Sequence, residues 1–346
     1  MKKTAIFKDP IFLEHDPGFT HVERPDRLEV IYDELHKPAY KDRFLYPSFE
    51  PASYEILKYN HTPALIERIA KTSGKTFDSL DPDTQTSPRS YEAACMAAGA
   101  CVKGVEMIFA GEIDNGFALV RPPGHHAEAD QAMGFCLFNN IAIAAHYALN
   151  NLKAQRVVIM DWDLHHGNGT QHSFYDTDQV LYISTHQYPY YPGTGAISEF
   201  GRGKGQGYTL NIPLSGGQGD GAYVQIFDQI VAPVIRQYNP DLILVSAGFD
   251  TYIEDPLGGM AVTAKGFGCL GRILIDLANE CCDGRILFVL EGGYNLQGLR
   301  DGVAAVLNEL SGTGSADKTL NPLRNNMASL PGLEHVRKFA KDFWIL

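Results

Sequence analysis

The sequence predicts an α/β fold in which a central, mostly parallel sheet is flanked by helices. Strand-like and helix-like segments alternate to about residue 310, without a repeat, a charge block or a Ser/Pro-rich linker between them. The strand-like segments are short and almost continuously apolar, as in Val157–Met160, which is typical of strands buried on both faces. The length alone would allow two domains, but this unbroken alternation favours a single domain over residues 1–346.

The expected elements follow from apolar runs, helical spacing and turn-forming residues. Short apolar runs predict strands at Ala5–Phe7, Gly116–Val120, Val157–Met160, Val180–Thr185, Tyr208–Pro213, Leu242–Ser246 and Ile286–Leu290. Helical patterns occupy Leu28–His36, two pieces of Ser53–Lys71 broken near Pro63, Tyr91–Ala110, Asn139–Leu149, Gly221–Tyr238, Thr263–Asn279, Leu296–Leu310 and Leu333–Phe343. Loops are expected at His15–Arg27, Phe77–Ser87, Met133–Phe138 and His186–Gly195.

Composition narrows the class of protein. The net charge of −12 disfavours nonspecific binding to nucleic acid or to anionic membranes, and it is common in soluble cytosolic proteins. The six cysteines form no Cys-x-x-Cys pair, so a cysteine-based zinc knuckle is not expected. The first residues, MKKTAIFKDP, lack the apolar core of a signal peptide, and no stretch approaches 18 apolar residues. We therefore expect a cytoplasmic protein with free thiols and no membrane span.

The stretch Arg156–Thr170 is the first candidate site. Asp161, Asp163 and His165 follow a buried strand at every second position. Because side chains alternate along a strand, we expect the three to project from one face of its C-terminal end, where α/β sheets bind ligands. Two carboxylates and an imidazole favour a metal site there. The spacing alone fits a capped turn with locally packed histidines equally well, so further ligands are needed.

Three other strand ends carry polar groups. His125 and His126 stand in the rigid turn RPPGHH, Asp250 ends AGFD, and Tyr294 lies in EGGYN. Each group alone is more typical of a structural turn. Four such groups at equivalent ends of different strands instead indicate one shared site.

The residue types in this site favour metal-assisted hydrolysis. Asp163, His165 and Asp250 are ligands of the kind found in catalytic zinc sites, which leave a position open for water and a carbonyl. Imidazoles titrate near neutral pH, so His125 and His126 suit the transfer of protons.

Tyr294 completes this chemistry. Its hydroxyl could donate a hydrogen bond to a tetrahedral oxyanion, and the flanking Gly292–Gly293 would allow a close backbone approach. The residues alone therefore predict a metal-dependent hydrolase of an amide or a similar bond.

Several long motifs resemble those of the histone deacetylase superfamily, namely RPPGHHAEADQAMGFCLFNNIAIA, DWDLHHGNGTQ, AGFDTYIEDPLGG and EGGYN. They are most similar to the class II and bacterial histone deacetylase-like amidohydrolase branch, over roughly residues 15–310. The resemblance implies an arginase-like three-layer fold and zinc-dependent removal of the acetyl group from an N-acetylated amine. It places one zinc ion on Asp163, His165 and Asp250, and makes His125 and His126 the catalytic pair and Tyr294 the oxyanion donor.

The resemblance also implies a structural potassium ion. Its ligands would be Asp161 and Ser184, together with backbone oxygens of Asp163, His165 and Thr185. Asp161 would additionally orient His125.

Further family positions would bind the substrate. Phe135 and Tyr191 match the aromatic walls of an acyl-lysine tunnel, which Gly293 would help to line. Asp83 resembles a rim aspartate that grips the substrate backbone. The segment HVERPDR resembles the first-loop signature near the site entrance.

Two positions distinguish branches of the family. Asn168 stands where class I members have an aspartate behind the second histidine, as it does in class II members and acetylpolyamine amidohydrolases. A neutral Asn168 would stabilise a charged His126 less than a carboxylate does. Some class II members that are poor on acetyl-lysine replace the tyrosine by histidine, whereas this chain keeps Tyr294, so we expect an active enzyme.

Rival functions remain open. Acetylpolyamine deacetylases resemble this chain but use an acidic gatekeeper, where this chain has Leu257, so N-acetylated lysine in a protein or peptide is favoured over a small N-acyl amine. A two-manganese hydrolase of arginase type would need a carboxylate where Tyr252 stands. A non-catalytic acyl-ligand binder would not need Tyr294 and the histidine pair. Iron or cobalt would suit the same ligands as zinc, and a homo-oligomer is compatible with the sequence.

Overall fold

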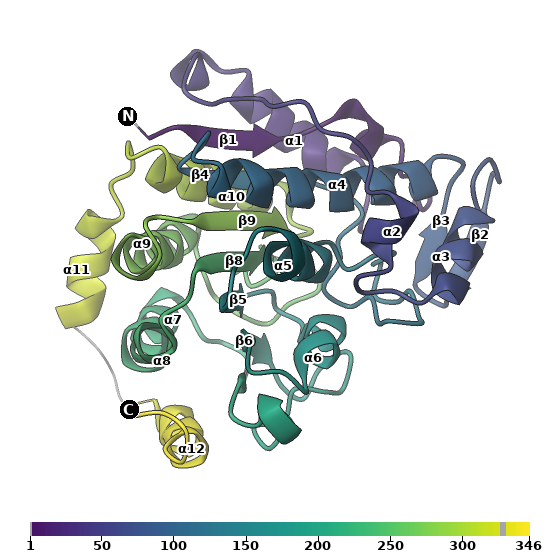
Figure 1. The fold of residues 1–346 in the computed structure, drawn as a ribbon. Helices are drawn as coiled ribbons and strands as arrows, with labels where there is room; N and C mark the ends of the chain where they lie inside the picture. Colours follow the sequence, from purple (N-terminus) through teal and green to yellow (C-terminus); the bar gives the residue numbers. More distant parts are fainter. Residues whose placement is uncertain (1, 326–329) are drawn as a thin grey trace.

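The computed structural model describes residues 2–325 and 330–346 and centres on a parallel sheet of seven strands (Figure 1). The strand order across the sheet is β1-β4-β9-β8-β5-β6-β7, and every neighbouring pair is parallel. The predicted α/β class with a mostly parallel sheet is confirmed. The strands are β1 (Thr4–Phe7), β4 (Asn115–Ala118), β5 (Val157–Asp161), β6 (Val180–Gln187), β7 (Thr209–Leu214), β8 (Leu242–Ala247) and β9 (Ile286–Leu290).

Helices cover both faces of the sheet and complete three layers (Figure 1). One face is covered by α4 (Ser90–Phe109), α5 (Asn140–Asn151) and α6 (Asn168–Phe174). The other is covered by α1 (Asp26–Leu35), α8 (Ala232–Tyr238), α9 (Ala264–Cys281) and α10 (Leu296–Leu310). The remaining helices are α2 (Tyr54–Leu57), α3 (Pro63–Ala70), α7 (Asp220–Ile226), α11 (Asp317–Asn325), α12 (Pro331–Ala340) and the 3₁₀ turns Pro10–Leu13, Pro38–Tyr40 and Gly203–Gly205.

The layers pack closely because small residues stand where backbones approach. A Cβ atom at Gly104 of α4 would lie 2.8 Å from the Leu287 side chain of β9. At Gly99, a Cβ atom would overlap the carbonyl oxygen of Glu50. The strands themselves are buried on both faces, which explains their continuous apolar character.

Four segments differ from the sequence-based expectation. The expected loop Phe77–Ser87 contains an antiparallel hairpin of β2 (Asp78–Asp81) and β3 (Thr84–Thr86), whose strands are too short and polar to show an apolar alternation. The helices α6 and α11 were not expected, because their sequences are polar. The expected helix Gly221–Tyr238 is interrupted by a π-helical turn at Phe227–Val231, just before Pro233, which has no N–H for the helical ladder.

Four strands position the candidate site. The strands β4, β9, β8 and β5 are neighbours in the middle of the sheet. Because they are parallel, their C-terminal ends open at the same edge. The segments that carry the polar groups predicted from the sequence follow these four strands.

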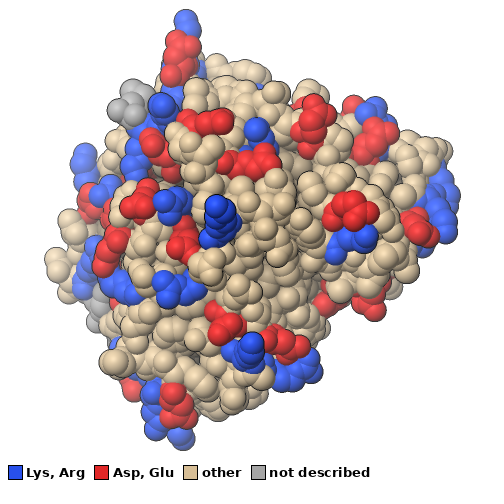
Figure 2. Space-filling view, viewed as in Figure 1, with Lys and Arg blue, Asp and Glu red and all other residues tan. Residues whose placement is uncertain are grey.

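The charged side chains of the visible face are mixed in sign. Figure 2 shows acidic and basic side chains interspersed over this face, so the negative net charge is not gathered into one patch there.

Within residues 2–325 and 330–346, the helices are too short or too polar to cross a membrane.

Candidate metal centre and active-site pocket

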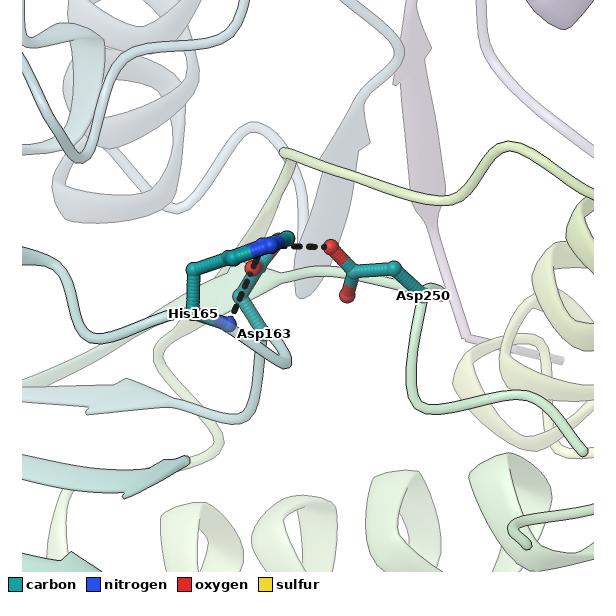
Figure 3. Close-up of side chains that lie close together, drawn as sticks. All are labelled: Asp163, His165 and Asp250. Atoms are coloured by element: carbon teal, nitrogen blue, oxygen red, sulfur yellow. Dashed lines mark hydrogen bonds and ion pairs between the residues drawn. The ribbon is translucent and has the colours of Figure 1, made fainter. Parts of the chain in front are cut away.

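Asp163, His165 and Asp250 converge at the edge of the sheet (Figure 3). Asp163 and His165 come from the segment after β5, and Asp250 comes from the segment after β8. His165 Nδ1 lies 3.2 Å from Asp163 Oδ1 and 3.1 Å from Asp250 Oδ2. Ligands about 2.0 Å from a tetrahedral zinc ion are spaced by roughly 3.3 Å, so these donor atoms fit a single ion.

The surrounding backbone holds the two carboxylates in this arrangement. Gly292 N–H donates to Asp163 Oδ2 at 2.9 Å, and Leu164 N–H donates to Asp250 Oδ1 at 2.8 Å. A Cβ atom at Gly248 would overlap the Asp163 carboxylate, and one at Gly292 would overlap the Asp250 carboxylate. The backbone therefore leaves room for both acids and fixes at least one oxygen of each carboxylate by a hydrogen bond.

A turn, not an extended strand, brings these ligands together. The strand β5 ends at Asp161, whose Oδ1 accepts from Asp163 N–H at 3.1 Å. The Asp163 carboxylate in turn accepts from His165 N–H at 2.9 Å. Of the three residues only Asp161 lies in the strand, so the expected alternation along one strand does not extend to Asp163 and His165. Asp161 Oδ2 lies 3.1 Å from His125 Nδ1 and accepts from the Tyr182 hydroxyl at 3.0 Å.

Burial and neighbouring charges shift the pKa values of the acids in opposite directions. Burial raises the pKa of Asp250, and the charge of Asp163 acts in the same direction. For Asp163, burial also favours the neutral form, but the nearby His125 and His165 outweigh it and lower the pKa. Two buried carboxylates that lie this close together, with pKa values shifted in opposite directions, are typical of a cation-binding site.

His125 and His126 lie side by side, with ring centroids 4.0 Å apart. His125 Nδ1 faces Asp161, whereas His126 Nδ1 lies 2.8 Å from Asn168 Oδ1. Burial lowers the pKa of His125, but the charges of Asp163 and Asp161 outweigh this and raise the pKa to about 10. Burial and the positive neighbours hold the pKa of His126 well below its usual value.

Tyr294 stands at the turn after β9. Its backbone N–H donates to Asp255 Oδ2 at 2.7 Å, and the Arg27 guanidinium lies 5.0 Å from its ring centroid. Burial raises the pKa of the Tyr294 hydroxyl, which stays protonated and can donate a hydrogen bond. The preceding Gly293 has a φ of +119°, and a Cβ atom there would lie 2.8 Å from Phe249 Cβ, so the turn requires glycine.

A pocket of about 370 Å³ opens onto these groups. Of the substrate-binding residues expected from the sequence, Asp83, Phe135, Tyr191 and Leu257 line it. Gly293 does not; its neighbour Gly292 does. The complete lining is Asp83, Pro123, His125, His126, Gly134, Phe135, His165, Tyr190, Tyr191, Leu257, Gly292 and Tyr294.

The side chain of Asp83 is fixed at the pocket. Its Oδ1 accepts from Gly134 N–H at 3.1 Å and from the Thr84 hydroxyl at 2.9 Å. Burial raises the pKa of Asp83, and the neighbouring Asp81 adds to the effect. The carboxylate is therefore held in place by the hairpin that the sequence did not reveal.

Three of the five residues expected to hold potassium, namely Asp161, Ser184 and Thr185, lie on two paired strands. Asp161 of β5 and Ser184 of β6 are partners in the sheet register. Ser184 Oγ lies 2.9 Å from His186 Nδ1. The Thr185 hydroxyl is buried and has no hydrogen-bond partner among the described residues.

Sequence reasoning assigned no role to Glu291 and no specific contact to Tyr190. Glu291 Oε2 accepts from Gly124 N–H at 2.7 Å and from His125 N–H at 3.1 Å, which holds the histidine turn. The ring of Tyr190 stacks on His165 at 5.8 Å between centroids, and its hydroxyl donates to the Leu257 carbonyl at 2.9 Å. Both stand directly beside residues that the motifs singled out, which was the available signal.

Comparison with known protein families agrees with this geometry. A family profile described as "Histone deacetylase domain" matches residues 21–310, which is more than half of the chain. A "Probable deacetylase" of Archaeoglobus fulgidus is 40% identical over 297 residues, covering 85% of this chain and 82% of the relative. A "Histone deacetylase-like amidohydrolase" of Pseudomonas aeruginosa is 37% identical over 344 residues, covering 94% and 90%.

Larger relatives and a solved structure extend the comparison. "Histone deacetylase 5" of Arabidopsis thaliana is 40% identical over 316 residues, covering 86% of this chain but only 47% of the plant protein. The chain thus spans about half the length of that relative. The crystal structure of the HDA15 HD domain superposes with a TM-score of 0.90 at 38% identity, covering 99% of this chain and 95% of that one.

Proposed function

The chain belongs to the histone deacetylase family and is therefore a hydrolase, and from this premise we propose that it cleaves the amide of an N-acetylated lysine in a protein or peptide. One observation carries the proposal: an aromatic-walled pocket of about 370 Å³ ends where three metal-type ligands, a histidine pair and a tyrosine converge. A related small N-acyl amine is the alternative substrate class.

Zinc is the ion we assign to Asp163, His165 and Asp250, because the spacing of their donor atoms suits tetrahedral coordination by oxygen and nitrogen. When bound, the ion would polarise the amide carbonyl and make a water molecule more acidic. One ion suffices for this chemistry, and Tyr252 offers no carboxylate for a second.

The histidine pair would move the protons. His126 faces the neutral amide of Asn168, which favours its uncharged form, so its ring suits the general base that accepts a proton from the attacking water. His125 faces the carboxylate of Asp161, which favours its charged form. The pair thus supplies an acceptor for one proton and a donor for the leaving amine.

Tyr294 would donate a hydrogen bond to the developing oxyanion. Its backbone N–H donates to Asp255, and its ring contacts both the Arg27 guanidinium and the ring of Phe135, whose centroid is 5.9 Å away. Such pre-positioned donors stabilise the transition state without having to reorganise.

The pocket walls would bind the acyl-lysine chain. Phe135 and Tyr191 offer aromatic faces to its methylene groups, and Leu257 offers no charge to a polyamine at the mouth. Asp83 would accept hydrogen bonds from the substrate backbone. Gly293, which was expected to help line the tunnel, is not among the residues that line the pocket, and its carbonyl accepts from Arg27 Nε at 2.7 Å.

We further propose a structural potassium ion at Asp161 and Ser184, with backbone oxygens of Asp163, His165 and Thr185. The pairing of Asp161 with Ser184 across two strands supports this proposal. A single catalytic domain over the whole chain and a cytoplasmic location are also proposals, the latter supported by six free thiols.

A side-by-side rate assay tests the function. The zinc-loaded protein is given an acetyl-lysine peptide and N8-acetylspermidine, each with and without a chelator. We expect faster, chelator-sensitive cleavage of the peptide. Faster cleavage of the polyamine would overturn the substrate assignment, and no cleavage of either would overturn the activity.

A further inference from the structure

His126 has a neutral hydrogen-bond partner behind it. Its Nδ1 lies 2.8 Å from Oδ1 of Asn168, the first residue of α6. An amide is neutral and has two chemically different ends, one that accepts hydrogen bonds and one that donates them. Asn168 therefore orients His126 only if something else decides which end of the amide faces the ring.

Glu128 decides the orientation of that amide. Its Oε1 lies 2.5 Å from Asn168 Nδ2. A carboxylate only accepts hydrogen bonds, so the NH₂ end of the amide must face Glu128 and the oxygen must face His126. Since that oxygen only accepts, His126 Nδ1 must carry the hydrogen, which leaves the lone pair of a neutral ring on Nε2.

His172 holds Glu128 at the outer end of this chain of contacts. Its Nδ1 lies 2.8 Å and 3.0 Å from the two oxygens of the carboxylate. The His172 side chain is 49% exposed, whereas that of Glu128 is 18% exposed. The contacts thus run from the buried ring of His126 to the surface through Asn168, Glu128 and His172.

We propose that Glu128 is a positioning residue that sets the tautomer of His126 through the amide of Asn168. The inference rests on the proposed function in one respect, namely that His126 is the base at the pocket. The carboxylate of Glu128 thus supports His126 indirectly, because Asn168 lies between the two side chains.

Loss of Glu128 leaves Asn168 Nδ2 with weaker acceptors. These are the His126 carbonyl at 3.3 Å and the Met133 sulfur at 3.5 Å. Without Glu128 the observed orientation of the amide is favoured less strongly, so the rotated amide is also populated. A rotated amide favours the His126 tautomer with hydrogen on Nε2, and in that tautomer Nε2 cannot accept a proton. We expect Glu128→Ala to lower kcat about tenfold, the effect of losing one hydrogen bond to a charged group, with KM changed less than twofold.

The conservative variant separates positioning from folding. In Glu128→Gln the side-chain oxygen still accepts from Asn168, so kcat should stay within about threefold of the unchanged protein. Asp228→Ala is the matched control, because it removes a carboxylate of similar exposure, 19%, that pairs with Arg324 away from the pocket. If Glu128→Ala behaves like this control, or Glu128→Gln is as impaired as Glu128→Ala, the proposal is wrong.

An exchange of groups tests the direction of the contacts. Asn168→Asp places two acceptors face to face and should lower kcat at least about tenfold. Adding Glu128→Gln supplies an amide donor to the new carboxylate, so the double variant should recover most of that loss. A double variant no better than Asn168→Asp alone would contradict the assigned orientation.

The tautomer itself is read by NMR of histidine-labelled, zinc-loaded protein, with the His126 signals assigned from a His126→Asn variant. Two-bond proton–nitrogen spectra should show hydrogen on Nδ1 of His126 in the unchanged protein and in Glu128→Gln, and a mixture of tautomers in Glu128→Ala. An unchanged tautomer in Glu128→Ala would overturn the proposal. This measurement needs no turnover, so it stands even if the proposed substrate or activity fails.

Discussion

The base and the mouth of the pocket are built differently. At the base, Asp163 and Asp250 are fully buried, and backbone N–H groups donate to both oxygens of Asp163 and to one oxygen of Asp250. At the mouth, the residues Tyr190 and Tyr191 are 40% and 37% exposed. The buried groups cannot move without breaking several hydrogen bonds, whereas the exposed rings can adjust. The base therefore fixes the chemistry, and the mouth is the part that selects the substrate.

Burying the two carboxylates at the base costs free energy, which a bound cation would offset. Two carboxylates in a low-dielectric space repel one another, and each loses its hydration. Asp250 responds with a raised pKa. Substitutions at the base and at the mouth test this difference between the two regions.

Asp250→Asn should have the largest effect. It keeps the shape of the side chain but removes the charge of one metal-type ligand, so we expect loss of bound zinc and at least about a thousandfold lower turnover. Metal content and single-turnover rates measure both. The exposed Asp276→Asn is the control, and near-normal zinc content with normal turnover in Asp250→Asn would remove Asp250 from the metal site.

Tyr294→Phe should come next. It removes only the oxyanion donor, so turnover should fall by about a hundredfold to a thousandfold while zinc content and the circular dichroism spectrum stay unchanged. Tyr32→Phe, which loses a hydroxyl contact to the Asp9 carbonyl far from the pocket, serves as control. Unimpaired turnover in Tyr294→Phe would sink the proposed role of the tyrosine.

Leu257→Glu should change selectivity more than rate. A carboxylate at the mouth attracts the charge of a polyamine, so the ratio of kcat/KM values for N8-acetylspermidine and the acetyl-lysine peptide should rise about tenfold. Ile253→Glu adds the same charge in the same loop, at a residue that does not line the pocket. An equal shift in both variants would mean that charge near the mouth matters and Leu257 is not the gate.

Tyr190→Phe should have the smallest effect. It removes the hydrogen bond to the Leu257 carbonyl but keeps the ring against His165. We expect kcat/KM for the peptide to fall less than about threefold, through KM. A tenfold fall in kcat would show that the mouth takes part in the chemistry and does not only select the substrate.

The sequence predicted the central sheet well because its strands are short apolar runs bounded by polar turns. It predicted less well where elements are polar. The hairpin β2–β3 and the helix α6 were not predicted, because neither sequence has a regular spacing of apolar residues. The helix α7 ends at Ile226, earlier than expected, and a π-helical turn follows it. The spacing of apolar residues does not predict where the missing N–H of Pro233 interrupts the helical hydrogen bonds.

The site was predicted at the level of residue types and strand ends. That Asp250 would meet Asp163 and His165 followed from parallel strands sharing an edge. Contacts between distant segments could not be predicted in this way. Glu128 and Asn168 are 40 residues apart, and only the packing of α6 against the loop after His126 brings them together.

The most direct test of the metal-dependent mechanism is a zinc titration of protein that has been stripped by a chelator. Turnover of the acetyl-lysine peptide and bound zinc are measured at each step. We predict no turnover without metal, and a linear rise that saturates at one zinc ion per chain. Turnover by the stripped protein, or saturation at two ions per chain, would contradict a mechanism built on the single site of Asp163, His165 and Asp250.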